Sequence, residues 1–204
     1  MSEREDITPE FLLAAYAQGY FPMARSETDD DFDWYYPRRR GVLSLEVEFP
    51  ISRSHKKLFR DHPYTLTLNQ DFRGVMEQCR RNRKGGCWIS DRLIDLYTQT
   101  QELGFAQSVE CWKDGVLTGG IYGISLGGVF FAESMFSRET GASKVALISL
   151  QRALRRAGYV LLDVQYVNEH LKQFGAMEIS RDNYLQRLTE ALAVVPQELD
   201  IGVG

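Results

Sequence analysis

Three polar side chains stand on two segments that otherwise have the composition of buried strands. Glu133 lies within VFFAESMFS (129–137), and Asp163 and Gln165 lie within LLDVQ (161–165). Burying an unpaired carboxylate is costly or forces it to take up a proton, so such groups normally have a partner. Each carboxylate alone has a simpler explanation, an edge position or a pairing with arginine. Together, on segments without Lys or Arg, they favour a cleft that receives a cationic ligand.

The spacing within each segment predicts which of these side chains share a face. Because side chains alternate along a strand, Glu133 should point the same way as Phe131 and Met135, and Asp163 the same way as Gln165. If the two strands are parallel neighbours, both faces can line one cleft at the carboxyl ends of the strands.

Other site chemistries fit this chain poorly. The three histidines (His55, His62 and His170) lack metal-ligand spacing, and no G-x-S-x-G turn occurs. Cys79, Cys87 and Cys111 are odd in number and show no C-x-x-C spacing, so a disulfide framework or a zinc site is not expected. We therefore expect no metal and no cofactor.

The elements around the three residues predict an α+β domain. Turn signals at 113–115 and 127–128 divide 108–137 into three antiparallel strands, and a helix over about 142–157 leads to the strand at 159–166. A strand–helix–strand crossover requires the strands 129–137 and 159–166 to be parallel. We expect an acetyltransferase-like (GNAT-like) mixed sheet flanked by helices.

The first part of the chain reads as a separate, smaller unit. Thr8 and Pro9 have the pattern of a helix start, VLSLEVEF (42–49) alternates like a strand, and 52–60 suits a short basic helix. Prolines at 50 and 63 bracket this stretch. We expect a small N-terminal subdomain over residues 1–62 and an acetyltransferase-like domain over residues 63–204.

Charge is unevenly distributed along the chain. Twelve Lys/Arg and five Asp/Glu lie between Arg38 and Lys84, a local +7 in a protein of net charge −4. The basic residues cluster at 37–41, 52–60 and 80–86, where solvated surface is the plainer explanation for any one cluster. Three clusters in an acidic protein favour a polyanion partner.

The N-terminus and the hydropathy of the chain give no sign of membrane insertion or export. No apolar run approaches the roughly 20 residues of a membrane helix, and MSEREDITPEF is unlike a signal peptide. We expect a cytoplasmic protein, a monomer, with no membrane partner.

An ordered set of motifs resembles the leucyl/phenylalanyl-tRNA–protein transferase family. The set comprises TPEFLLAAYAQGYFPMA (8–24), ESMFSR (133–138) with ASKVAL (142–147), LLDVQ (161–165), HL (170–171) and FGAMEISR (174–181). The chain departs from the family at Val164, where cysteine is usual. Val164 should face away from the site, so we expect little effect.

The resemblance implies an aminoacyl transfer reaction. Leu or Phe, less readily Met, would pass from aminoacyl-tRNA to the N-terminal Arg or Lys of an acceptor protein, and the product would be directed to proteolysis. Because the donor is an activated ester, aligning the attacking amine supplies most of the catalysis. Asp163, Gln165 and Glu133 would be the catalytic residues: Gln165, oriented by Asp163, positions or relays the proton of the amine. Alternatively, Asp163 and Glu133 mainly anchor the basic acceptor.

Residues for the donor follow from the same resemblance. The aminoacyl pocket would draw on Phe130, Phe131, Ser134, Met135 and Phe136, although core packing is an alternative for the apolar ones. Trp34 or Trp88 would stack on the terminal adenosine, and the tRNA would contact Arg80, Arg81, Arg83 and Lys84. Two other functions stay open: an acetyl-CoA-dependent N-acetyltransferase, since Arg138–Ser143 is a near miss to the acetyl-CoA loop pattern, and a non-catalytic RNA-binding module.

Overall fold

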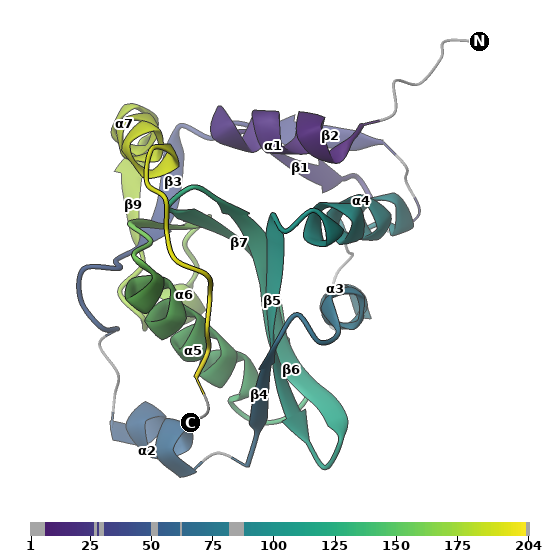
Figure 1. Ribbon diagram of the computed structural model, residues 1–204, viewed down its shortest axis with the longest axis vertical. Helices are drawn as coiled ribbons and strands as arrows, with labels where there is room; N and C mark the ends of the chain where they lie inside the picture. The colour runs from purple at the N-terminus through teal and green to yellow at the C-terminus, as the bar shows by residue number, and fades with distance from the viewer. Residues whose placement is uncertain are drawn as a thin grey trace.

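A seven-stranded mixed sheet forms the centre of the structure, a computed structural model that describes residues 7–26, 28, 31–49, 53–61, 63–81 and 88–202 (Figure 1). The strands lie in the order β4 (Thr65–Leu68), β5 (Ala106–Lys113), β6 (Val116–Leu126), β7 (Val129–Ser137), β8 (Leu161–Gln165), β3 (Arg39–Leu43) and β9 (Met177–Ser180). Only β7 and β8 pair in parallel; the other neighbours are antiparallel.

The crossover between β7 and β8 runs through α5 (Ala142–Ala157), as the sequence predicts. α5 ends at Gly158, whose φ of +86° lies in the left-handed region that glycine adopts without a side-chain penalty. An antiparallel meander followed by a parallel strand pair confirms the acetyltransferase-like α+β fold with a mixed sheet flanked by helices.

The parallel pair is short, and this shortness opens the site. β7 and β8 are paired only from Val129 to Phe131 and from Leu161 to Asp163. β7 continues for six more residues after the last pair, and β8 ends two residues later. Side chains beyond the last pair can therefore point into the space between the two strand ends.

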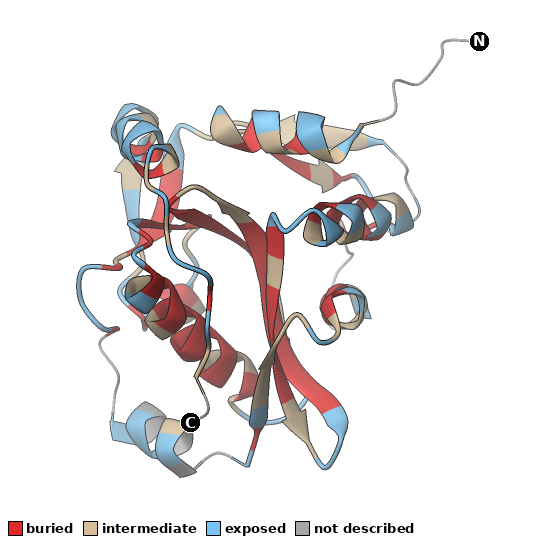
Figure 2. Cartoon of the chain, in the orientation of Figure 1, coloured by how far each residue is buried: buried red, intermediate tan, exposed pale blue. Residues whose placement is uncertain are grey.

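Two apolar layers cover the sheet (Figure 2). One face packs against α1 (Pro9–Ala17), α3 (Phe72–Arg81), α4 (Asp91–Glu102), α7 (Arg181–Leu192) and the small β1–β2 ribbon (Phe21–Ala24, Phe32–Tyr35). The other face packs against α5, with α2 (Arg53–Asp61) and α6 (Glu169–Lys172) beside it. The α1 start is confirmed: the Thr8 side chain accepts a hydrogen bond from the Phe11 N–H.

The N-terminal region differs in one respect from the expectation. The strand expected over 42–49 begins and ends earlier, at Arg39–Leu43, and it lies inside the large sheet between β8 and β9. Its residues extend the sheet by pairing with β8 on one side and with β9 on the other. The boundary expected at residue 62 thus assigns a strand of this sheet to the N-terminal subdomain, and the domain division stays a proposal.

None of the helices in the described part of the chain combines the length and the apolar character that crossing a membrane requires.

Candidate active site

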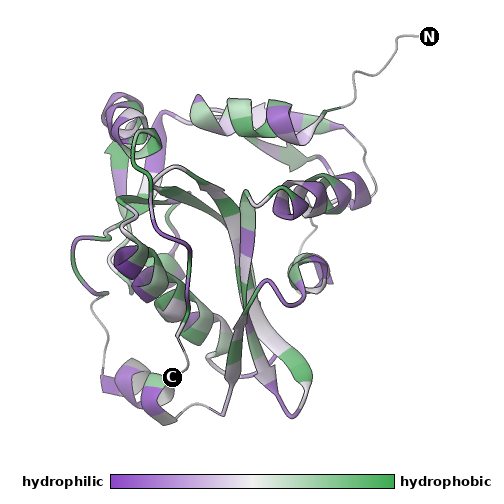
Figure 3. Cartoon of the chain, viewed as in Figure 1, coloured by the Kyte–Doolittle hydropathy of each residue, from purple (hydrophilic) through white to green (hydrophobic). Residues whose placement is uncertain are grey.

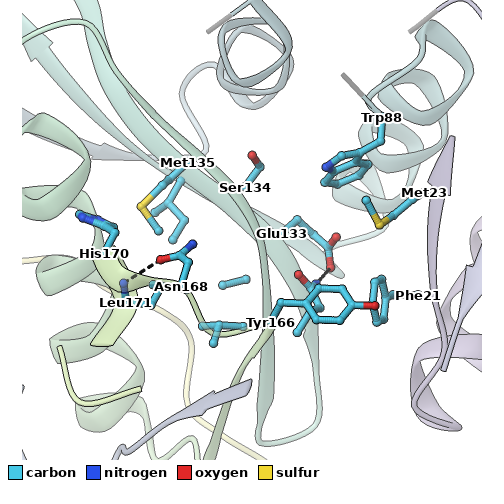
Figure 4. A pocket seen from close by; sticks show the side chains of 14 residues that line it. Phe21, Met23, Trp88, Glu133, Ser134, Met135, Tyr166, Asn168, His170 and Leu171 are labelled. Atoms are coloured by element: carbon cyan, nitrogen blue, oxygen red, sulfur yellow. Dashed lines mark hydrogen bonds between the residues drawn. The ribbon is translucent and has the colours of Figure 1, made fainter. Parts of the chain in front are cut away.

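A cavity of about 290 Å³ opens where β7 and β8 diverge (Figure 4). We call it the Glu133 cavity. Its wall is drawn from β1, the segment before α4, β6, β7, the end of β8, and α6 with the residues before it. The lining residues are Phe21, Met23, Trp88, Ile121, Ala132, Glu133, Ser134, Met135, Val164, Gln165, Tyr166, Asn168, His170 and Leu171. Its volume is at the lower end of the range for small-molecule sites.

Glu133 is the carboxylic acid of this wall. The Tyr16 hydroxyl donates to its Oε1 at 2.6 Å and the Gln165 amide donates to the same oxygen at 2.7 Å. Burial raises the pKa of Glu133 to about 8, against the lowering effect of the Tyr16 and Gln165 hydrogen bonds. At neutral pH the cavity therefore holds a largely protonated carboxyl group.

Gln165 adopts an unusual backbone conformation at the end of β8. Its φ is +58°, a left-handed value that is uncommon for a residue with a side chain. Its backbone N–H donates to Asp163 Oδ1 at 2.8 Å while its side-chain amide reaches Glu133. Such conformations persist where the surroundings enforce them, and they cluster at functional sites.

Asp163 is fully buried, and it accepts hydrogen bonds from four donor atoms of three residues. The Arg40 guanidinium binds it from Nε and Nη2, the latter at 2.7 Å from Oδ2, and the Tyr184 hydroxyl donates at 2.7 Å. The Gln165 N–H is the remaining donor. Burial would lower the pKa of Arg40, but the adjacent Asp163 carboxylate raises it above its usual value. Asp163 thus forms a buried ion pair.

This ion pair corrects one expectation. β7 and β8 carry no cation, so a cationic ligand was the expected partner of Asp163. The partner is Arg40 of β3, a strand that lies next to β8 in the sheet but far from it in sequence. Arg40 also donates to the Gly19 carbonyl, and its guanidinium lies over the rings of Phe21 and Tyr184. Asp163 is sealed from the cavity and holds Gln165 in place.

A β-bulge changes the faces expected along β7. Tyr122 pairs with Ser134 and Gly123 with Ala132, so Glu133 is an extra residue without an opposite partner. Beyond it the alternation shifts by one residue. Phe131 consequently packs in the core layer under α1, α3 and α4, whereas Met135 packs in the layer of α5, not on the same face as strict alternation predicts.

The bulge also decides which of the expected aminoacyl-pocket residues reach the cavity. Ser134 and Met135 line it. Phe130, Phe131 and Phe136 pack in the core with at most 3% of their surface exposed. Val164 lines the cavity as well, contrary to the expectation that it faces away, because the strands splay and both faces of the end of β8 reach the opening.

The residues expected to contact tRNA lie in several places. Trp88 lines the cavity, whereas Trp34 lies on β2 with its ring 5.6 Å from that of Phe11. Arg80 forms an ion pair with Asp91 at 2.5 Å, and Arg81 lies 3.8 Å from Glu77. Arg83 and Lys84 lie outside the described residues.

Sequence reasoning missed the groups that hold the three polar residues. They are Tyr16, whose hydroxyl also shares a 2.5 Å hydrogen bond with that of Tyr97, and Arg40 and Tyr184. Arg40 was concealed by its place in a basic cluster, PRRRG, that resembles solvated surface. Among the described residues, no group of three or more His, Cys, Asp or Glu side chains could hold a metal ion.

Two solved structures are among those similar to this chain. One is L-PGS from Bacillus licheniformis, with a TM-score of 0.47, 16% identity, and coverage of 93% of this chain and 79% of that one. The other is a GCN5-related N-acetyltransferase-like protein from Streptococcus suis, with a TM-score of 0.37, 18% identity, and coverage of 69% and 60%.

Closer similarity is found to curated proteins named leucyl/phenylalanyl-tRNA–protein transferase. That of Paramagnetospirillum magneticum is 47% identical over 189 residues, 92% of this chain and 90% of the relative. That of Maricaulis maris is 48% identical over 185 residues, 90% and 85% of the two chains.

Two family models match different parts of the chain. A model described as leucyl/phenylalanyl-tRNA protein transferase matches residues 42–189, and one described as the N-terminal domain of the same family matches residues 5–38. The expected resemblance is confirmed: the chain belongs to the leucyl/phenylalanyl-tRNA protein transferase family and is an aminoacyl-tRNA–protein transferase.

Proposed function

We propose that the enzyme transfers Leu or Phe, and less readily Met, from aminoacyl-tRNA to the N-terminal Arg or Lys of an acceptor protein. The new peptide bond gives the acceptor a destabilising N-terminal residue, a signal for degradation. The enzyme would act in the cytoplasm as a monomer. The observation that carries this proposal is the Glu133 cavity, which joins an apolar wall to a hydrogen-bonded Glu133–Gln165 pair.

The apolar wall suits the donor side chain. Ile121, Ala132, Met135, Val164 and Leu171 line the cavity, and all but Met135 are buried or nearly so. A narrow apolar space distinguishes side chains by shape, with about 1–3 kcal/mol for one methylene. Unbranched Cβ atoms, as in Leu, Phe and Met, would fit where the branched Cβ of Ile and Val would collide with the wall.

Gln165 and Glu133 suit the attacking amine. In the reaction the amine nitrogen bonds to the ester carbonyl carbon, the bond to the ribose oxygen breaks, the amine loses a proton and the ribose oxygen gains one. The side-chain NH2 group of Gln165 donates to Glu133. The side-chain carbonyl oxygen of Gln165 is then available to accept a hydrogen bond from the amine. The pKa of Glu133, about 8, is close to that of an α-amino group, so a proton can pass between them at little cost.

Asp163 would act by positioning Gln165, not by touching the substrate. Its oxygens are occupied by Arg40, Tyr184 and the Gln165 N–H. Alignment of the amine against an activated ester supplies most of the rate in such a reaction. Loss of the left-handed turn at Gln165 would therefore abolish transfer even though Asp163 is not a base.

The RNA end of the donor requires a stacking surface and cations. Trp88 lies in the cavity wall, and stacking of the terminal adenosine on it would contribute about 1–3 kcal/mol. Among the basic stretches, α2 carries the exposed cations Arg53, Lys56 and Lys57. We propose α2 as a contact for the tRNA backbone, beside the predicted contacts at Arg80, Arg81, Arg83 and Lys84 and the predicted stacking at Trp34.

One assay tests the proposal against its alternatives. Radiolabelled Leu-tRNA and a peptide that begins with Arg are incubated with the enzyme, and acetyl-CoA replaces the tRNA in a parallel reaction. Leucyl transfer to the peptide is the expected result. Turnover of acetyl-CoA without leucyl transfer would favour the N-acetyltransferase, and RNA binding with neither activity would favour a binding module.

A further inference from the structure

The acceptor in the proposed reaction carries a second cation that the carboxylates of the site do not account for. Its α-amine must lie at Gln165 and Glu133, next to the ester, so the side-chain cation of Arg or Lys lies elsewhere. Glu133 is the single carboxylic acid among the described residues that line the cavity, and Asp163 is sealed by Arg40 and Tyr184. A different kind of group must receive the side-chain cation.

Aromatic rings form the rim of the cavity beside Gln165. Tyr166 follows Gln165 directly, lines the cavity and is 49% exposed. Its ring lies 5.9 Å from that of Phe21 at 77°, and Phe21 stacks at 5.8 Å on Tyr35, which is 36% exposed. Figure 4 shows the Tyr166 side chain with its hydroxyl end beside Phe21, below Glu133 in this view. The buried Phe21 thus contacts two exposed tyrosine rings, of which that of Tyr166 lines the cavity.

We propose that Tyr166, supported by Phe21 and Tyr35, is the subsite for the side-chain cation of the acceptor. The inference rests on the proposed function, because it presumes an acceptor with N-terminal Arg or Lys. A cation over an aromatic ring gains electrostatic energy from the negative face of the ring, more strongly where water is excluded. Both guanidinium and ammonium groups bind in this way, which matches a site that takes Arg and Lys.

The charges around this subsite are compatible with a cationic guest. The Arg40 guanidinium lies 4.5 Å from the centre of the Phe21 ring, but its charge is compensated by the bidentate pairing with Asp163. Burial raises the pKa of Tyr166, so its hydroxyl is neutral at physiological pH. Glu169, an exposed acid three residues after Tyr166 in the sequence, pairs with Lys172 at 2.6 Å.

The subsite is tested by separating charge recognition from binding of the donor. Steady-state transfer is measured with a peptide that begins with Arg and with the same peptide beginning with citrulline, which is neutral but nearly isosteric. The enzymes are wild type, Tyr166→Leu, which keeps apolar bulk without a π face, and Tyr166→Phe, which keeps the π face. Glu169→Gln serves as the control for an exposed carboxylate close to Tyr166 in the sequence.

We expect Tyr166→Leu to raise the KM of the Arg peptide by about 2- to 30-fold, the range of a single cation–π contact, without a matching fall in kcat. Its preference for Arg over citrulline should shrink by the same factor. Tyr166→Phe should lie closer to wild type than Tyr166→Leu does, and Glu169→Gln should keep the wild-type preference.

Three results would overturn the inference while the proposed function stands. They are an unchanged Arg-peptide KM in Tyr166→Leu, a rise confined to the KM of Leu-tRNA, which would make Tyr166 a stacking partner of the adenosine, and a loss of the Arg preference in Glu169→Gln. A wild-type enzyme that transfers leucine to neither peptide contradicts the proposed function itself.

Discussion

Glu133 and Asp163 are buried carboxyl groups on neighbouring strands, and their surroundings give them different charges. Asp163 meets a guanidinium, and its ion pair is complete within the protein. Glu133 meets a tyrosine hydroxyl and an amide, neither of which compensates a full charge, so its pKa rises to about 8. The site therefore combines a charge that is fixed in an ion pair, that of Asp163, with an exchangeable proton, that of Glu133.

The raised pKa of Glu133 makes the stability of the fold depend on pH. Between about pH 4.5 and pH 8 the folded state retains the Glu133 proton while the unfolded state releases it. The stabilisation that this proton gives the folded state is therefore complete below the ordinary pKa and is lost as pH rises through the raised pKa. We expect Glu133→Gln to gain stability relative to wild type across this interval, by up to roughly 1.4 kcal/mol per pH unit.

Urea unfolding from pH 5 to pH 9 measures this difference. Glu169→Gln is a matched control, because Glu169 is exposed and the chemical change is the same. Parallel pH curves for wild type and Glu133→Gln would show that Glu133 has an ordinary pKa in the folded protein.

Tyr16 affects the pKa of the same carboxyl group, that of Glu133. Its hydroxyl donates to Glu133 Oε1 and favours the ionised form. Tyr16→Phe removes this donor, so the pKa of Glu133 should rise by roughly one unit, in line with a hydrogen bond to a charged group. The acidic limb of kcat/KM for transfer should then move to higher pH.

A purely structural role for Tyr16 would lower the rate without moving this limb. Tyr64→Phe removes a hydroxyl that bonds to the Thr140 carbonyl away from the cavity, so its pH profile should match that of wild type. A fixed limb in Tyr16→Phe would separate Glu133 from the rate-determining proton.

At the scale of elements, the sequence predicts what is local. The meander and the crossover helix follow from side-chain periodicity and turn residues, and both are present. The position of β3 could not be predicted, because pairing with β8 and β9 is a long-range choice that leaves no local pattern. For the same reason the sequence gives Asp163 as a site residue but not its partner Arg40.

The bulge on β7 is the second feature that periodicity conceals. One additional residue reverses the faces of all side chains beyond it, and nothing in the letters VFFAESMFS marks where it lies. Its signal is on the opposite strand: β6 carries Gly123 at the register shift. A Cβ at this position would overlap the carbonyl oxygen of Phe131 and the ring of Phe130.

Gly123→Ala should therefore disturb the bulge and displace Glu133. We expect a loss of at least 1–3 kcal/mol in the free energy of unfolding, the usual cost of overpacking, together with a transfer rate lowered by tenfold or more. Gly104→Ala is the control: nothing lies near its added methyl group, and only the left-handed backbone, φ +86°, costs roughly 1–2 kcal/mol. Activity retained in Gly123→Ala would mean that the bulge does not set the site.

At the scale of the whole molecule, the site belongs to both the N-terminal segment and the sheet. Tyr16 of α1 and Phe21 and Met23 of β1 reach the cavity or its carboxyl group, and Arg40 ties the turn at Gly19 to Asp163. The N-terminal segment therefore closes one side of the cavity. The expected boundary at residue 62 would place these residues in a different domain from Glu133 and Asp163, which they contact.

The distribution of charge is the other property of the whole molecule, and it favours α2 as the contact for the RNA backbone. In the basic stretch 37–41, Arg40 is buried in its pair with Asp163 and Arg39 lies near Glu178. In the stretch 80–86, Arg80 and Arg81 lie near acidic side chains. α2 instead has Arg53, Lys56 and Lys57 exposed, and Figure 3 colours its described part mostly as hydrophilic. Within the described residues these three cations have no acidic partner, so an RNA backbone is their expected counterion.

Replacement of Arg53, Lys56 and Lys57 by Gln should weaken tRNA binding and its dependence on salt together. Each phosphate neutralised contributes about 0.7–0.9 to the log–log slope, so three should lower its magnitude by roughly 2–3. The matched control replaces Arg25, Arg73 and Lys113. This variant also loses three positive charges, but these cations form ion pairs with Asp33, Asp95 and Glu139. Dissociation constants measured at about 50 to 300 mM salt compare the slopes of the two triple variants. Equal slopes in the two triple variants would show that only net charge matters, and a slope lowered only in the control would move the tRNA to another face.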